Sequence, residues 1–410
     1  MDILIGRTIE LLAIAIVVAI VARRLKLPYT VGLVLTGLAL ALMRFDAGFI
    51  LTREVIFDAI LPPLLFEAAL NIGWSELRRD LVPVVAISTF GVLLCGAVVA
   101  GGLVFALGWP VGSALAFGAL IGATDPIAVI ALLKDTGVKG RLALLIESES
   151  LANDGVAALV FTIVLTALAP GAAPLTAASV GRELLLIVGG GVAIGVIVGL
   201  AGLLSARRTD DHLVETALTT VVAWGSFLIA DRVGASGVLA CVAAGLVMGN
   251  IGVNRESHSP LTDEGRRFVG AFWEFAAFLA NSFVFLMIGL ALARSPVRSW
   301  ETFAIVVVLS LAGRAAAVYP LALAFAPTRW KIPIAQQHFL WWAGLRGALA
   351  LALALSLPDT FPYRQEILVA AFGVVAFSVL VQGMTAGRAL KWLKLDADAC
   401  EISSEAGSPR

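Results

Sequence analysis

Charged residues are scarce in this sequence, and the cysteine patterns of disulfide-rich and zinc-binding proteins are missing. Only 14% of the 410 residues are charged, against about 25% in an average soluble domain, and 60% are hydrophobic. Cys95, Cys241 and Cys400 lie far apart without CxxC or Cys/His spacing, so neither a disulfide framework nor a zinc site is implied. The 29 basic and 29 acidic side chains cancel, so nothing favours a nucleic-acid partner. With a mean hydropathy of +0.97, the composition is typical of a membrane protein.

Long apolar stretches, separated by proline, glycine and charged residues, fill most of the chain. Because about 20 helical residues cross a bilayer core of roughly 30 Å, they predict an all-α polytopic membrane protein. The 13 predicted spans are 3–22, 28–43, 50–72, 82–107, 111–133, 141–168, 180–204, 211–230, 234–251, 267–292, 299–325, 333–357 and 364–387. We expect one transmembrane domain over 1–390 and a short, polar cytoplasmic tail over 391–410. The first stretch carries Arg7 and Glu10 and precedes no small-residue cleavage site, so we expect a retained helix.

The basic residues predict how the chain lies in the membrane. When the 29 lysines and arginines are sorted into alternate loops, nineteen fall on one side and seven on the other, and three lie within spans. Cytoplasmic loops carry the excess of basic residues. The count therefore predicts a multi-pass protein of the cell membrane, with its N-terminus outside and its C-terminus in the cytoplasm.

Six ionisable residues interrupt the predicted spans. A charge at the centre of a bilayer costs about 2.5–3.5 kcal/mol even on the lenient insertion scale, so each of them is a functional hypothesis. They are Glu67, Asp125, Glu149, Asp154, Arg314 and Arg346. If two acids pair with the two arginines, the remaining acids need a mobile cation or a proton. This balance describes a site that exchanges a metal ion for a proton.

The segment 147–155 carries the densest polar pattern. At 100° per residue, Ser150 and Asp154 share one face of a helix, while Glu149 and Asn153 share the adjacent face. One stripe can offer a hydroxyl and a carboxylate to an ion while the other meets a packing partner. The alternative is an amphipathic helix start with capping residues, but Asp154 lies a dozen or more residues beyond the basic loop 139–141, near mid-membrane.

Two apolar runs are broken near their middle. Pro126 breaks the run at 122–126, where the freed Thr124 carbonyl could bind a cation, and glycines interrupt the run at 343–348. Paired breaks in two halves of a chain indicate a transporter site between inverted repeats, here 1–168 and 211–387 joined by 180–204. Arg346 would neutralise converging carbonyl ends and Asp125 converging N–H ends. The alternatives are a proline kink capped by Asp125 and a glycine-rich packing face.

Four motifs, in this order on 13 spans, resemble the monovalent cation/proton antiporters of the NhaP and NHE type. They are ATDP at 123–126, ESLAND at 149–154, GLRGA at 344–348 and VQGMT at 381–385. The resemblance implies a homodimer in which each protomer has a dimerisation domain and a core domain with two crossed broken helices. Alternating access would come from movement of one domain against the other. The usual ESLLND has Ala152 in place of its second leucine, and the regulatory tail of animal members is missing, so tail-binding partners are not expected.

The resemblance also assigns roles to the polar residues. It implies that Na⁺ binds to Asp154, Ser150, Glu67 and the Thr124 carbonyl, and that Asp125, Asn153 and Arg346 support the site. Glu149 with Arg314 resembles the structural ion pair of this family. Glu67, considered alone, is also compatible with a side chain that reaches for the headgroup region.

The expected function is secondary exchange of Na⁺, or of Li⁺ or K⁺, for H⁺. No cofactor or ATP is expected, because the sequence has no GxxxxGK[ST] loop. A buried carboxyl favours its protonated form and a bound cation favours the ionised one, so the two ions compete for Asp154. Asn153 stands where electrogenic relatives have a second aspartate, which predicts electroneutral exchange. The alternatives are a passive cation channel and an intramembrane aspartyl protease that uses Asp125 and Asp154, although no GxGD element occurs.

Overall fold

The computed structural model describes residues 2–25, 27–45, 51–169, 171, 176–255, 259–294 and 300–396, and every regular element in these ranges is helical. Seven of the described helices are long and apolar enough to cross a membrane unaided. Each of the 13 predicted stretches contains at least one helix, so the predicted all-α polytopic fold is confirmed. Of the predicted tail, residues 397–410 lie outside the described residues.

The first half of the chain contains the helices of the first six predicted spans. They are α1 (Asp2–Leu25), α2 (Tyr29–Leu42), α3 (Leu61–Asn71), α4 (Trp74–Leu107), α5 (Val111–Leu120), α6 (Ile127–Asp135) and α7 (Arg141–Leu168). A π-helical segment, Val55–Ile60, leads into α3. The sequence predicted the α4 span from residue 82, but α4 begins eight residues earlier, because its polar first turns project beyond the apolar run and kink at Asp80.

The second half and the linking segment contain the remaining helices. They are α8 (Ala177–Leu184), α9 (Gly190–Ala206), α10 (His212–Arg232), α11 (Gly237–Val247), α12 (Asp263–Arg294), α13 (Trp300–Ala324), α14 (Ile334–Trp342), α15 (Ala348–Leu355), α16 (Arg364–Phe377) and α17 (Met384–Trp392). Three further π-helical segments, Leu185–Gly189, Met248–Val253 and Ser378–Gly383, continue α8, α11 and α16. The apolar pattern of the sequence did not predict these segments.

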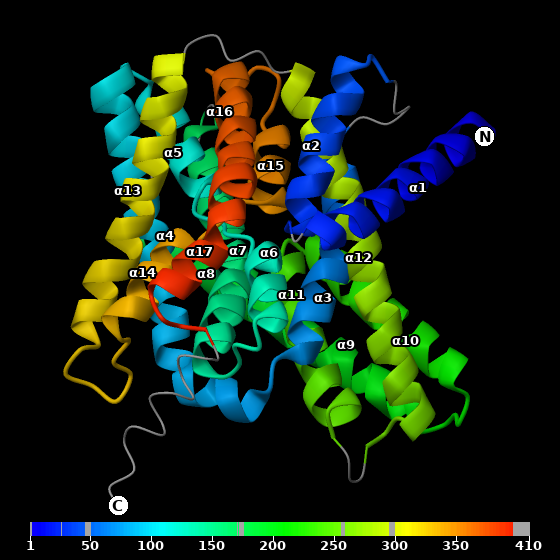
Figure 1. Ribbon diagram of the computed structural model, residues 1–410. Helices are drawn as coiled ribbons and strands as arrows, with labels where there is room; N and C mark the ends of the chain where they lie inside the picture. The colour runs from blue at the N-terminus through cyan, green and yellow to red at the C-terminus, as the bar shows by residue number, and fades with distance from the viewer. Residues whose placement is uncertain are drawn as a thin grey trace, which may run out of the picture.

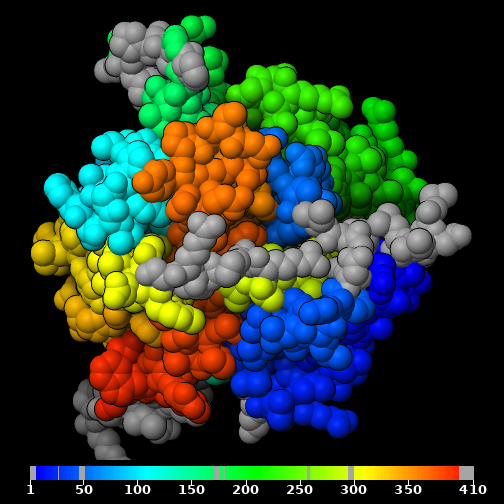
Figure 2. All heavy atoms as spheres, turned by 90° about the horizontal axis from the view of Figure 1, so that it is seen from above, coloured from blue at the N-terminus to red at the C-terminus, as the bar shows by residue number. Residues whose placement is uncertain are grey.

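The helices pack as two bundles (Figures 1 and 2). The first bundle consists of α4 to α7 and α13 to α17, in which α4 packs on α5, α7 and α13. The second bundle consists of α1 to α3 and α9 to α12, in which α12 packs on α2 and α3, and α11 on α3 and α9. Seen from above, the cyan, yellow, orange and red helices of the first bundle lie on one side and the blue and green helices of the second on the other.

Close approach of α2 and α12 depends on two glycines. A Cβ atom on Gly37 would collide with the Leu286 carbonyl, and one on Gly289 would collide with the Val34 carbonyl. Small residues let helix backbones approach closely in a membrane, where lipid tails remove the usual hydrophobic drive for association. This packing fixes α12, which lines the site described below, against the rest of the second bundle.

Candidate cation and proton site

Two interrupted helices meet inside the first bundle. The α5–α6 break covers residues 121–126 and the α14–α15 break covers 343–347. The Asp125 backbone N–H donates to the Leu345 carbonyl at 2.7 Å, which joins the two breaks directly. The Asp125 Oδ1 atom accepts from the Ile127 N–H at 3.0 Å and so caps α6. A Cβ on Gly347 would overlap the Asp125 carboxylate, so this approach needs glycine.

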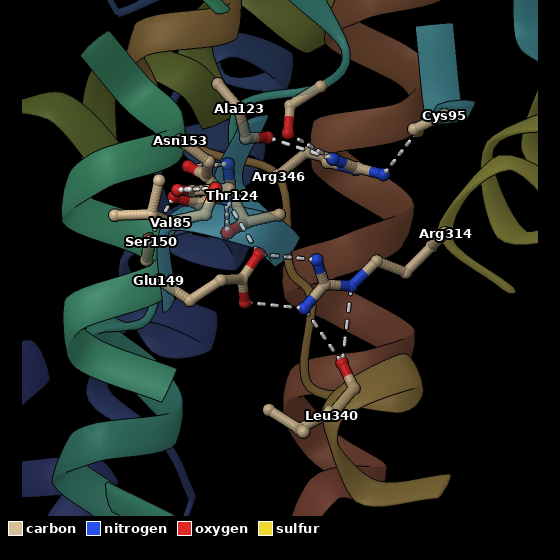
Figure 3. Close-up of polar contacts among 12 residues, drawn as sticks. Val85, Cys95, Ala123, Thr124, Glu149, Ser150, Asn153, Arg314, Leu340 and Arg346 are labelled. Atoms are coloured by element: carbon tan, nitrogen blue, oxygen red, sulfur yellow. Dashed lines mark hydrogen bonds and ion pairs between the residues drawn. The ribbon is translucent and has the colours of Figure 1, made fainter. Parts of the chain in front are cut away.

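Arg346 occupies the junction between the breaks (Figure 3). Its guanidinium donates to the carbonyls of Gly122 and Ala123, each at 3.1 Å, and lies 3.5 Å from the Cys95 Sγ atom. The side chain is buried, with 3% exposed. Buried backbone carbonyls that are freed from a helix need a hydrogen-bond donor. Arg346 donates to two of the carbonyls that the α5–α6 break frees.

The polar stripe of α7 is tied to the α5–α6 break through Thr124. The Ser150 hydroxyl donates to the Thr124 carbonyl. The Asn153 amide accepts from the Thr124 N–H at 3.2 Å and donates to the Thr124 Oγ1 at 2.7 Å and to Glu149 at 3.1 Å. Asn153 therefore holds the backbone of the break in place and has its amide committed to protein partners.

Glu149 and Arg314 form a buried ion pair that joins α7 to α13 (Figure 3). The guanidinium donates to both carboxylate oxygens, at 2.7 and 2.8 Å, and to the Leu340 carbonyl at the end of α14. Both side chains are buried, with at most 7% exposed. The pair neutralises Glu149 within the protein, so this carboxylate is not available to a mobile ion.

Asp154 has no such partner. Its Oδ1 atom is buried and, within the part of the chain that the structure describes, accepts no hydrogen bond. The carboxylate faces a cavity of about 350 Å³ that is also lined by Ser150, Thr124, Asp125 and Glu67. All four residues that the resemblance implies as ligands therefore line one cavity. The Glu149 and Asn153 stripe is not among its lining residues.

The charged residues of the cavity form an inner and an outer group. Asp154 interacts electrostatically with Asp125 at the α5–α6 break and with Glu149, which lies on the same helix outside the cavity lining. Glu67, which accepts from the Asn71 amide at 2.8 Å, interacts with Lys134 and Glu274 instead. Among the described residues, no three acidic, histidine or cysteine side chains gather closely enough to hold one metal ion.

The cavity is closed at the breaks and reaches the surface at the end of α6. The lining residues Thr124 and Ala348 are buried, whereas Lys134 and Asp135 are exposed. The inner end offers a carboxylate with hydroxyl and carbonyl oxygens, which are hard ligands. Such a set, with one free carboxylate, suits a monovalent cation better than Ca²⁺, which usually collects several carboxylates.

Several polar cavity residues were not predicted from the sequence, among them Lys134 and Asp135 near the surface and three further residues. Glu147, Glu274 and Asn281 all line the cavity. Glu274 lies inside the predicted span 267–292, so the rule applied to the six other ionisable residues could have found it. Glu147 belongs to the segment already singled out, one helical turn before Leu151. Asn281 is an uncharged amide within an apolar run and gives only a weak signal.

The chain resembles known transport proteins along nearly its whole length. The transmembrane region of the sodium/hydrogen exchanger family matches residues 11–392. The Na⁺/H⁺ antiporter ApNhaP of Aphanothece halophytica is 38% identical over 379 residues, which cover 92% of this chain and 71% of the relative. The Na⁺/H⁺ antiporter NhaP of Pseudomonas aeruginosa is 36% identical and covers 89% and 91%. The solved structure of the sodium proton antiporter MjNhaP1 from Methanocaldococcus jannaschii matches the fold with a TM-score of 0.77 at 20% identity, over 96% of this chain and 99% of that one.

Proposed function

Because this chain belongs to the sodium/hydrogen exchanger family, we propose that it exchanges Na⁺ for H⁺ and that the two ions compete for Asp154. The observation that carries the site is the buried Asp154 Oδ1 atom, which faces the cavity without a hydrogen-bond partner in the described chain. An isolated carboxylate is costly to bury. The empty ionised state is therefore disfavoured, and the carboxyl binds either a proton or a cation.

The neighbouring oxygens complete the proposed cation site. Ser150 uses its proton to bond the Thr124 carbonyl, which leaves hydroxyl lone pairs for a cation. The Thr124 carbonyl keeps a second lone pair. Glu67 lines the same cavity from α3, so the proposed ligands come from both bundles. Asp125, Arg346 and the Glu149–Arg314 pair hold the two breaks in position around them.

Exchange of one cation for one proton moves no net charge. The Asn153 amide hydrogen-bonds to Thr124 and Glu149 and does not titrate. Of the two adjacent positions 153 and 154, only Asp154 therefore carries a carboxylate that can exchange a proton for a cation. Electroneutral exchange follows if Glu67 keeps the same protonation state through the cycle. A second proton on Glu67 would make two protons move for each Na⁺.

Alternating access needs a site between two parts that move against each other. The cavity has lining residues on α6, α7 and α15 of the first bundle and on α3 and α12 of the second. Each bundle draws helices from the proposed repeats 1–168 and 211–387, and α9 belongs to the linking segment between them. We propose that the bundles are the two moving parts.

The basic residues set the proposed orientation. The cavity reaches the surface near Lys134, on the side that carries the excess of basic loops. With this side in the cytoplasm, the cavity faces inward. A homodimer, with the N-terminus outside and the C-terminus in the cytoplasm, stays a prediction from the resemblance and from the count of basic residues.

Transport by purified protein in liposomes tests the function. An outward-directed or inward-directed proton gradient should drive Na⁺ uphill, and Li⁺ and K⁺ can replace Na⁺ in the same assay. A passive channel would let Na⁺ only equilibrate, and a protease would give no proton-coupled flux. Failure of a pH gradient to concentrate any of these cations would contradict the proposal.

A further inference from the structure

One face of α12 borders the cavity. Glu274, Ala277, Phe278 and Asn281 all line it. They are spaced at i, i+3, i+4 and i+7, which places them on one stripe of a helix. The stripe begins with a carboxylate near the outer group of charges and ends with an amide. It belongs to the second bundle, across the cavity from α7.

Asn281 is buried and its amide oxygen is not paired. Its residue exposure is 8%, and its Oδ1 atom accepts no hydrogen bond from any described residue. The next residue, Ser282, is bound to Tyr29 of α2 and to the Phe278 carbonyl, so it serves the packing of α2 on α12. Asn281 instead faces the cavity. Unpaired buried acceptors are rare in folded proteins, and each calls for a partner that the protein itself does not supply.

Two residues that each carry an unpaired, buried oxygen therefore line the same cavity from opposite bundles. Within the described residues, the Oδ1 atoms of Asp154 and Asn281 are the buried side-chain oxygens without a partner that belong to residues lining the cavity. Both are acceptors. The lining also carries more acidic than basic side chains, with Lys134 as its basic member. An occupant that satisfies acceptors in an acidic cavity is a cation, bare or with its bound water.

We propose that Asn281 determines cation specificity by binding the transported ion through Oδ1, directly or through one water molecule. This inference rests on the proposed function of the same cavity. An amide oxygen is a neutral dipole, so it stabilises the cation without adding a second exchanging proton. The number and position of such oxygens set selectivity between monovalent cations. The contact comes from the second bundle, so it also links cation binding to the relative position of the bundles.

The test compares Asn281→Leu, which keeps the volume and removes the oxygen, with Asn281→Asp, which keeps an oxygen at the same place. Ser282→Ala is the matched control, because it weakens α12 packing without touching the cavity lining. Proton flux in liposomes gives KM and maximal velocity for Na⁺ and Li⁺ at one pH. The shift in melting temperature with added NaCl in detergent gives binding without transport.

We expect Asn281→Leu to raise the KM for Na⁺ about tenfold, the value of one hydrogen bond to a charged group, with a maximal velocity within about twofold of wild type. The ratio of KM for Na⁺ to KM for Li⁺ should change, and thermal stabilisation by NaCl should need correspondingly more salt. Asn281→Asp should bring the KM for Na⁺ back toward wild type or below it. Ser282→Ala should keep the wild-type KM ratio even if its melting temperature falls.

Several outcomes would overturn the inference. One is a folded Asn281→Leu protein whose KM for Na⁺ and preference between Na⁺ and Li⁺ match those of wild type. Another is an Asn281→Leu protein that loses only maximal velocity, by the same factor for Na⁺ and Li⁺. If Asn281→Leu does not fold, Asn281→Ala takes its place in the same comparison with Asn281→Asp. Asp154→Asn is measured alongside. Exchange by that variant would refute the proposed competition of the two ions for Asp154, whereas an inactive Asp154→Asn with a normal Asn281→Leu refutes only the role of Asn281.

Discussion

Removal of Arg314 should unfold the first bundle more readily while the ion-binding side chains stay in place. The Arg314 guanidinium pairs with Glu149 at 2.7 and 2.8 Å and also bonds the Leu340 carbonyl. Arg314→Ala leaves the buried Glu149 carboxylate with only the Asn153 amide at 3.1 Å. Breaking a buried ion pair by removing one partner costs about 3–5 kcal/mol, because the remaining charge is stranded.

A double-mutant cycle separates this coupling from other effects. The free energy of unfolding is measured for wild type, Arg314→Ala, Glu149→Gln and Glu149→Gln/Arg314→Ala in detergent. Removing both charges strands neither, so we expect the double variant to recover part of the loss. Arg7→Ala is the matched control, since Arg7 and Glu10 are also 2.7 Å apart but 32% and 52% exposed. Exposed pairs of this kind contribute about 0–1 kcal/mol.

Losses that add in the double variant would mean that the two side chains are not coupled. A loss no larger than that of Arg7→Ala would contradict the burial of the charge. Either result would refute the reasoning that Glu149 is neutralised within the protein and unavailable to the transported ion.

Three further predictions concern the cavity. If Na⁺ and H⁺ share Asp154, the KM for Na⁺ should rise about tenfold for each unit by which the pH is lowered, over the range where the site is mainly protonated, with a smaller change in maximal velocity. A KM that is flat from pH 6 to 8 would indicate a separate proton carrier. The rate of electroneutral exchange should not change with a membrane potential clamped by K⁺ and valinomycin, which would contribute about 2.3 kcal/mol per 100 mV for each charge moved. A voltage-dependent rate would mean that Glu67 also takes up a proton during the cycle. Gly347→Ala should reduce transport strongly, because its methyl group would displace the Asp125 carboxylate, whereas Gly101→Ala, with open space around it, should transport as wild type does; equal activity of the two variants would contradict the tight crossing of the breaks.

Much of the fold and the inner site could be predicted because ionisable residues and breaks are costly in a membrane and stand out in an apolar sequence. Pro126 and the glycines around Arg346 located the two breaks. The helical spacing in α7 separated the Ser150 and Asp154 face from the Glu149 and Asn153 face, as the cavity lining and the hydrogen bonds place them.

Other features depend on how helices are rotated against each other, which an apolar run does not encode. Glu274 and Asn281 reach the cavity because of the way α12 is turned by its packing on α2 and α3. An uncharged amide in a span is equally compatible with helix–helix contact. The ion pair of Arg141 with Asp80, at 2.8 Å, lies at the kink of α4, and Pro83, three residues after Asp80, is the signal in the sequence that could have located this kink.

The most direct test of the account is Na⁺-driven proton flux by purified Asp154→Asn protein in liposomes. Asparagine keeps the shape of the side chain but removes both the charge that binds the cation and the group that accepts the proton. We expect no flux above that of empty liposomes, from a protein whose melting temperature matches or exceeds that of wild type. Substantial Na⁺-driven proton flux by this folded variant would contradict the assignment of Asp154 as the shared site.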